Sequence, residues 1–118
     1  MRPWTGDETR GHLIATFRGD FGKPRPCVVL QADRFIDDFD SVLVCPLSST
    51  IEPTHIVRIP MEPSPANGLR EPSVITTDKT TTILKRRIGT AVGAVDATTM
   101  DRITFALALL AGMSTEEI

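Results

Sequence analysis

The chain has 118 residues, a length that predicts a single domain spanning residues 1–118. Thirteen Lys and Arg residues against fifteen Asp and Glu residues give a formal net charge of −2. This balance excludes a generic polyanion-binding surface, so any contact with nucleic acid needs a local basic patch. No apolar run approaches the roughly 18 residues of a membrane span, and residues 1–10 carry no apolar signal core. We therefore expect a cytoplasmic protein with reduced thiols, and residues 1–10 as a loose lead-in.

Six short apolar segments, separated by turns that contain Gly and Pro, are typical of β-strands. Pro46 is expected to end the third segment, while residues 61–72 and 79–84 are interpreted as a long loop and a threonine-rich crossover. Gly89 and Gly93 in the last segment indicate a bend or a close approach of another backbone. The predicted strands cover residues 11–17, 27–31, 41–45, 55–60, 73–78 and 88–95.

One helix is predicted at the C-terminal end, where the apolar period changes from that of strands to that of a helix. Asp96 is the expected N-cap and Gly112 the expected stop. The helix is apolar enough to contact a second subunit as well. The apolar residues at helical spacing are Met100, Ile103, Leu107, Leu110 and Ala111. Short strands followed by one helix favour a mainly-β fold, a small antiparallel β-barrel or sandwich with a C-terminal α-helix.

Residues 22–31 combine a basic, proline-stiffened turn with an apolar strand. Pro24 and Pro26 bracket Arg25 and limit its backbone freedom, because proline fixes its own φ and restricts the preceding residue. The strand that follows would anchor this arginine from the core. A guanidinium is permanently charged and offers a planar fork to phosphate oxygens. The stretch therefore predicts a phosphate-handling cation, although a surface arginine at a turn fits the same residues.

Other polar residues also follow predicted strands and could converge with Arg25 in a small barrel. Ser48, Ser49 and Thr50 follow the third strand, and Asp78-Lys79 end the fifth and begin the crossover. Guanidinium and hydroxyl groups together suit a phosphodiester. In RNA the 2′-OH is already the nucleophile, so cleavage strictly needs no metal, no cofactor and no histidine. The hydroxyl cluster fits equally well a turn that bonds its own backbone.

The remaining candidate groups favour simpler interpretations. His12 and His55 could form an acid–base pair, but they fit ordinary strand-end residues better. No CxxC or HxxxH spacing appears, so a metal site has little support. Cys27 and Cys45 lie in apolar runs and are expected to be core thiols; a disulfide stays open if their two strands pair.

Several segments resemble the MazF/PemK family of toxin endoribonucleases in order and spacing. The resemblance extends roughly from residue 10 to residue 112 and is most specific at the Arg-Pro pair before an apolar strand. It implies an SH3-like barrel with a C-terminal helix. The segments are residues 11–14, 22–30, 44–50 with 54–55, 85–89, and the final helix.

The resemblance also implies a function. Members of the family are homodimers that cleave single-stranded RNA without a metal, leaving a 2′,3′-cyclic phosphate and a 5′-hydroxyl, and a cognate antitoxin blocks the site. Arg25 falls on the catalytic arginine, Ser48 on a catalytic threonine or serine, and residues 18–23 on a loop that gates the RNA groove. Candidates for binding RNA are Lys23, Ser49, Thr50, Lys79, Lys85, Arg86 and Arg87.

Two departures and one alternative accompany this resemblance. His12 stands where the family usually has an acidic residue, and Ser48 replaces the commoner threonine while keeping the hydroxyl. Residues 74–78 with 88–89 also resemble CcdB, a gyrase poison of the same fold that acts by binding protein rather than by cutting RNA. The tryptophan-glycine-isoleucine tail that CcdB uses is absent, since the chain's one tryptophan is Trp4.

Overall fold

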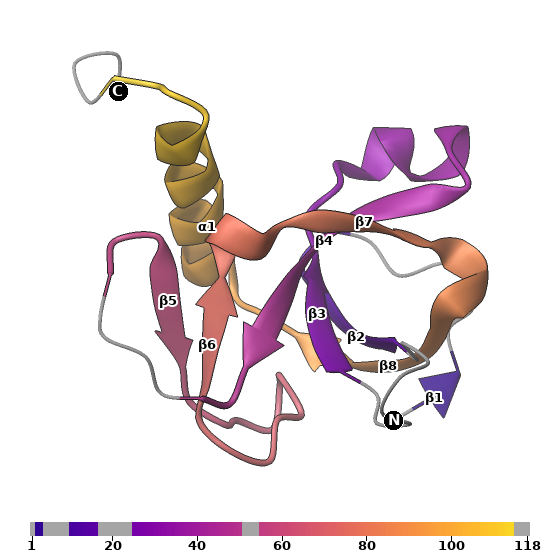
Figure 1. The fold of residues 1–118 in the computed structure, drawn as a ribbon. Helices are drawn as coiled ribbons and strands as arrows, with labels where there is room; N and C mark the ends of the chain where they lie inside the picture. Colours follow the sequence, from indigo (N-terminus) through magenta and orange to yellow (C-terminus); the bar gives the residue numbers. More distant parts are fainter. Residues whose placement is uncertain (1, 4–9, 17–24, 51–54, 115–118) are drawn as a thin grey trace.

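The computed structural model describes residues 2–3, 10–16, 25–50 and 55–114. Its elements form an antiparallel β-sheet, three short 3-10 helices (η) and one α-helix (Figure 1). The strands are β1 Arg2–Pro3, β2 His12–Thr16, β3 Arg25–Val29, β4 Ser41–Ser48, β5 Arg58–Met61, β6 Ser73–Thr76, β7 Thr81–Leu84 and β8 Ile88–Ala94. The helices are η1 Asp33–Asp38, η2 Thr77–Lys79, η3 Lys85–Arg87 and α1 Ala97–Leu110.

The strand order is β1-β8-β2-β3-β4-β6-β5, and β7 pairs with β4 beside this path. The predicted class, mainly β with a C-terminal helix, is confirmed. Within the described residues the pairing does not close the sheet into a barrel. The long strand β4 pairs with β7 as far as Val44 and with β6 from Leu47 onward, so the sheet divides at this strand.

The central strands are buried on both faces, which explains their nearly continuous apolar sequences. Along β3, Val28 faces one core cluster, while Cys27 and Val29 face the other. The first cluster lies under α1 and includes Met100 and Ile103. Strand β3 is thereby fixed from two sides, and its first residue, Arg25, is the one that reaches the surface.

Helix α1 has the predicted caps. The Asp96 carboxylate accepts a hydrogen bond from the Thr99 N–H at 2.7 Å, which satisfies a donor in the first turn. Gly112 has a φ of +97°, and the N–H groups of Gly112 and Met113 donate to the carbonyls of Leu109 and Ala108 at 3.0 and 2.8 Å. This pattern is a Schellman motif, in which a glycine adopts the left-handed conformation.

Several boundaries differ from the sequence predictions: the strands expected over 27–31 and 55–60 lie at Arg25–Val29 and Arg58–Met61, and three further differences change the pairing of the sheet. The third strand continues through Pro46 to Ser48, because one side of β4 changes partner from β7 to β6 around Pro46, where the missing N–H donor is tolerated. The predicted crossover contains strand β7, which pairs with Ser41–Val44 of β4. The predicted loose lead-in contains Arg2–Pro3, which pair with Ala91 and Thr90 of β8.

Cys27 and Cys45 are not joined by a disulfide, and both are buried. Their strands do pair, with Cys27 opposite Pro46 and Val28 opposite Cys45. Successive residues of a strand face opposite sides of a sheet, so the two sulfurs belong to different core clusters. Burial raises the pKa of the Cys45 thiol to about 12. Among the described residues, no helix is long and apolar enough to span a membrane.

Candidate functional site

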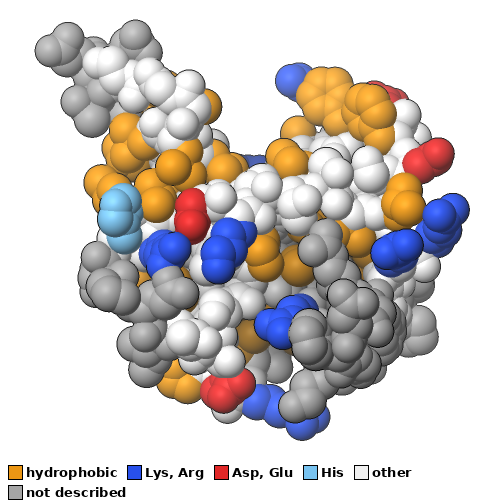
Figure 2. Space-filling model, viewed as in Figure 1, with side chains coloured by type: hydrophobic (Ala, Val, Ile, Leu, Met, Phe, Trp, Pro, Cys, Tyr) orange, Lys and Arg blue, Asp and Glu red, His pale blue; other side chains and the backbone are white. Residues whose placement is uncertain are grey.

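A pocket of about 380 Å³ lies where the start of β3 meets the end of β4 and the loop before β6. It combines cationic, anionic, hydroxyl and apolar groups in one concave surface. Figure 2 shows Lys and Arg side chains distributed across the middle of this face of the molecule. The lining residues are Arg25, Pro26, Leu47, Ser49, Leu69, Arg70, Glu71 and Ser73.

Arg25 is the first residue of β3 and is exposed, whereas the three residues from Cys27 to Val29 are buried. The strand therefore holds the arginine backbone firmly while its side chain reaches the pocket. In the described part of the chain, no ion pair or side-chain hydrogen bond engages the Arg25 guanidinium. With respect to the described residues, its donors are therefore available to a ligand.

Of the predicted hydroxyl cluster, Ser49 lines the pocket, whereas Ser48 and Thr50 are its chain neighbours outside the lining. The register sets Cys27 opposite Pro46, and continuing it by two residues would set Arg25 opposite Ser48. Ser49 lines the pocket, while the Ser48 hydroxyl oxygen accepts a hydrogen bond from the Thr50 N–H at 3.1 Å. The turn therefore bonds its own backbone and still leaves the Ser48 O–H able to donate.

The loop after β5 contributes Arg70 and Glu71, two charged residues that the sequence reasoning did not select. A buried side chain, Asn67, holds this loop: its carbonyl oxygen accepts from the N–H groups of Ser64 and Leu69, each at 3.0 Å, and its amide donates to the Glu62 carbonyl at 2.8 Å. The Asn67-Gly68 turn was the signal in the sequence that the loop has a defined shape.

Two glycines let the loop lie against β8. A Cβ on Gly93 would come within 2.5 Å of the Asn67 carbonyl carbon and oxygen. Gly68 has a φ of +69° and lies against the Val92 backbone. The close backbone approach predicted for Gly93 is therefore confirmed, and it fixes the distance of the loop from the sheet.

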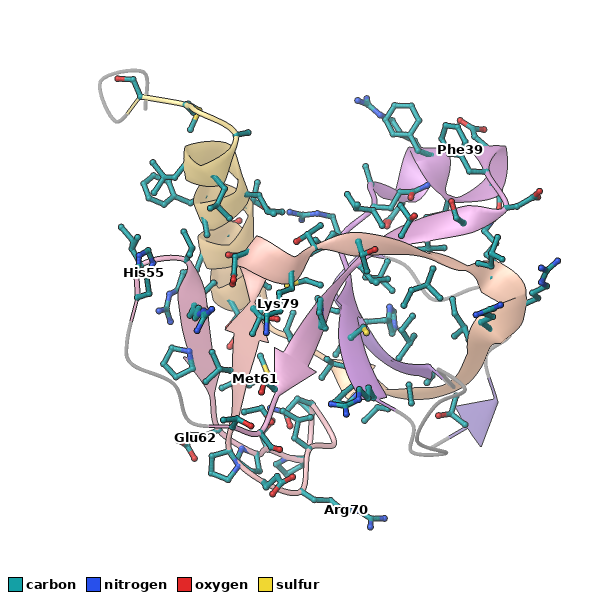
Figure 3. All side chains as sticks on the ribbon, viewed as in Figure 1. Phe39, His55, Met61, Glu62, Arg70 and Lys79 are labelled. Carbon is teal, nitrogen blue, oxygen red and sulfur yellow. The ribbon has the colours of Figure 1, made fainter. Side chains whose placement is uncertain are left out.

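The predicted RNA-binding lysines and arginines do not all gather at this pocket. The Lys85 ammonium donates to the Ile36 carbonyl of η1, so it is engaged within the protein. Arg86 and Arg87 are exposed on η3, outside the pocket lining. Lys79 is exposed on η2, and Figure 3 shows it above the region where β4 and β6 meet. Lys23 and the predicted gating loop at residues 18–23 lie outside the described residues.

Asp78, which the sequence placed at a strand end, has an internal partner. Its two carboxylate oxygens accept hydrogen bonds from the Arg58 side chain at 3.3 and 3.1 Å. The hydrogen bond from Arg58 holds the pKa of the Asp78 carboxyl below its usual value. Arg58 and Asp78 thus form a structural pair that links β5 to η2.

The histidines are not part of the pocket. His55 Nδ1 accepts a hydrogen bond from the Val57 N–H at 3.2 Å, and Figure 3 shows His55 beside α1. His12 pairs with Ala94 at the start of β2. Among the described residues, no cluster of three or more His, Cys, Asp or Glu side chains could hold a metal ion.

A second, more apolar hollow of about 600 Å³ lies between β5 and α1. Ile56 on its rim is 67% exposed, and Leu110 near the end of α1 is 49% exposed. Its lining is His55, Ile56, Arg58, Ile59, Pro60, Thr98, Asp101, Arg102 and Phe105.

Comparison with known proteins identifies the family. Residues 10–111 match the family of PemK-like, MazF-like toxins of type II toxin–antitoxin systems. The chain belongs to this family. A probable endoribonuclease MazF of Mycolicibacterium smegmatis is 38% identical over 107 residues, which cover 89% of this chain and 97% of that protein. The match selects the MazF-like interpretation, and nothing in these comparisons favours the CcdB-like alternative.

Solved structures show the same fold. The toxin MazF-mt6 of Mycobacterium tuberculosis has a TM-score of 0.73 at 25% identity, covering 89% of this chain and 99% of that one. A mycobacterial endoribonuclease in complex with its cognate antitoxin has a TM-score of 0.76 at 22% identity, covering 91% and 97%. A MazE–MazF complex of Deinococcus radiodurans has a TM-score of 0.74 at 21% identity, covering 91% and 98%.

Proposed function

We propose that this protein is the toxin of a type II toxin–antitoxin pair and that it cleaves single-stranded RNA without a metal, as one domain over residues 1–118. Membership in the MazF-like family supports this activity. The observation that carries it is the pocket in which the unpaired Arg25 meets Ser49, beside Ser48. The guanidinium of Arg25 and the two serine hydroxyls suit a phosphodiester, because each of them can donate a hydrogen bond to its non-bridging oxygens.

In the proposed reaction, the 2′-oxygen of the substrate attacks the adjacent phosphorus and loses its proton to water. The bond from phosphorus to the 5′-oxygen breaks, and that oxygen takes a proton from water, which leaves a 2′,3′-cyclic phosphate and a 5′-hydroxyl. Arg25 donates to the phosphoryl oxygens, whose negative charge grows in the transition state. Ser48 orients the same phosphate from the neighbouring strand, with Ser49 and Thr50 as further donors.

The test is incubation of the purified protein with a set of varied single-stranded RNAs in EDTA, followed by mapping of the cut ends. We expect cleavage with cyclic phosphate and 5′-hydroxyl ends in the wild type and none in Arg25→Ala. Arg34→Ala removes an equal charge from an arginine on η1 that lines neither the pocket nor the apolar hollow, and it should still cut. Absence of cleavage on all RNAs, together with inhibition of gyrase supercoiling, would replace this proposal with a gyrase poison.

We further propose that the protein acts as a cytoplasmic homodimer that a cognate antitoxin inhibits. The apolar hollow between β5 and α1 supports a second subunit there, since exposed Ile56 and Leu110 would otherwise face water. The unpaired arginines of the pocket support an acidic antitoxin segment as the inhibitor.

The dimer is tested by sedimentation at micromolar concentration. We expect the wild type at twice its chain mass of 12.9 kDa. Ile56→Glu should shift it toward the monomer. Phe39→Glu is the matched control, because Phe39 is also exposed but lies beside η1, across the molecule from His55 (Figure 3). A monomeric wild type, or equal effects of the two variants, would contradict the assignment of this face.

A further inference from the structure

The pocket contains a carboxylate that a phosphate-binding surface does not need. Glu71 lines it together with Arg25 and Arg70. A carboxylate repels a phosphate, so its presence weakens binding of the backbone unless it recognises another part of the ligand. The nucleotide offers one such part, the base, whose edges carry N–H donors. Glu71 therefore points to base recognition within the proposed RNA site.

The protein holds Glu71 in place without engaging its charge. The Ser73 hydroxyl donates to the Glu71 carbonyl at 3.1 Å, and Ser73 is buried at the first residue of β6. Asn67 fixes the loop on the other side. In the described part of the chain, neither Arg25 nor Arg70 forms an ion pair with the Glu71 carboxylate. Because the backbone is already fixed, ligand binding has to order only the Glu71 side chain and not the loop that carries it.

The remaining lining suits the faces of a base. Pro26, Leu47 and Leu69 contribute apolar surface between the charged residues. The volume of about 380 Å³ falls in the range of small-ligand pockets. A base bound here would lie against apolar side chains and present its edge to Glu71. Its phosphate would then lie toward Arg25, which lines the same pocket.

We propose that Glu71 selects guanine at the nucleotide adjoining the scissile phosphate. This inference rests on the proposed RNA-cleaving function. An ionised carboxylate only accepts hydrogen bonds, and guanine presents two adjacent donors, N1–H and the N2 amino group, to its two oxygens. Adenine and cytosine present one amino donor beside an acceptor. Uracil presents one N–H between two carbonyls, which repel the carboxylate.

The test is cleavage of a randomised RNA pool, sequenced at the cut sites. Wild type should be enriched for guanine next to the cut. Glu71→Gln should lower that preference by about 5- to 100-fold, the discrimination of one bidentate contact, and raise adenine, whose edge matches an amide. Glu62→Gln is the control, because Glu62 comes from the same loop but lies outside this pocket, on another side of the loop from Arg70 (Figure 3).

A second measurement does not depend on cleavage. Binding of 2′-O-methyl trinucleotides that differ only in guanine or uracil should favour guanine in the wild type and lose that ratio in Glu71→Gln. An equal ratio in both proteins would overturn the inference even if RNA is cut. Guanine-selective binding without cleavage would instead overturn the proposed activity alone. Complete loss of cutting in Glu71→Gln at unchanged melting temperature would also overturn the inference, because Glu71 would then act in the reaction rather than in selection.

Discussion

Arg25 and Arg58 each stand at the first residue of a strand, and the two arginines have different surroundings. Arg25 opens β3 and Arg58 opens β5. Arg58 donates to both carboxylate oxygens of Asp78, and its side chain is 24% exposed. Arg25 lines a pocket in which, among the described residues, no carboxylate pairs with it. The same residue type at the same position of a strand is structural in one case and available to a ligand in the other.

The pairing of an arginine with a carboxylate of the protein distinguishes arginines that stabilise the fold from arginines that can bind a ligand. A guanidinium that already faces a carboxylate must give up that interaction before it can bind phosphate. Arg25 and a second arginine, Arg70, line the same pocket with one carboxylate, Glu71, so the lining carries a net positive charge although the whole chain has a net charge of −2. The internal partner, rather than the position along the strand, decides the role.

The largest expected difference between the two arginines is in the rate of RNA cleavage. Arg25→Ala should lower the rate of RNA cleavage by about 100-fold or more, since one donor to a developing oxyanion contributes that much. Arg58→Ala should leave the rate within about 3-fold, because it removes no donor from the pocket. Single-turnover cleavage of one labelled RNA measures both rates.

Thermal unfolding provides the control for this pair. Arg25→Ala should unfold like the wild type, because the side chain is exposed and unpaired within the described residues. If the two variants lost cleavage equally, the distinction between paired and unpaired arginines would be wrong for this protein.

The role of Arg25 as a candidate phosphate-binding residue could be predicted from the sequence, because the features that indicate it lie next to it in the chain. Prolines next to it restrict the backbone, and the apolar run after it defines the strand. Strand β7 was missed for the opposite reason: it contains three polar or partly exposed positions, and only Ile83 is buried. Its pairing with residues 41–44 of β4 bridges about forty residues of sequence, and such a contact overrides local propensity.

Arg70 and Glu71 were also missed by the sequence prediction, because their place in the candidate site depends on a long-range contact. Their residue types are ordinary for a surface loop, and their place beside Arg25 depends on the approach of Asn67 to Gly93. The glycine and the Asn-Gly turn were visible separately in the sequence. Only the fold shows that they touch, because nothing in a single sequence records which loop packs on which strand.

The second prediction concerns this contact. Gly93→Val should lower the free energy of unfolding by about 1–3 kcal/mol, because the added side chain meets the Asn67 backbone. Cleavage should fall as well, since the loop that carries Arg70 must move. Urea unfolding and the cleavage rate measure the two effects. Gly112→Ala is the matched control. Its φ of +97° strains alanine, but among the described residues no atom beyond the chain neighbours lies within 4 Å of the added Cβ, so only stability should change.

The third prediction extends the comparison to Arg70. Arg70→Ala should weaken RNA binding by about 10-fold and reduce the salt dependence by roughly the contribution of one phosphate contact. Arg34→Ala removes the same charge from η1, where Arg34 lies over the Phe35 ring at 4.7 Å, and should change neither. Titrations of a non-cleavable RNA at several salt concentrations measure the slope. An unchanged slope in Arg70→Ala would assign this arginine to the surface rather than to the site.

The fourth prediction has the smallest effect and concerns the paired arginine itself. The folded-state pKa of Asp78 lies below its usual value of 3.8, so the pair stabilises the protein above that pH and the contribution disappears as pH falls through the folded pKa. Arg58→Ala should therefore cost roughly 0.2–1 kcal/mol near pH 7 and less near pH 2. Urea unfolding at both values, with Asp78→Asn as the second variant, measures this. The effects of the two variants should not be additive, because both remove the Arg58–Asp78 pair. Equal losses at both pH values would mean that Arg58 acts through packing of its aliphatic stem rather than through its charge.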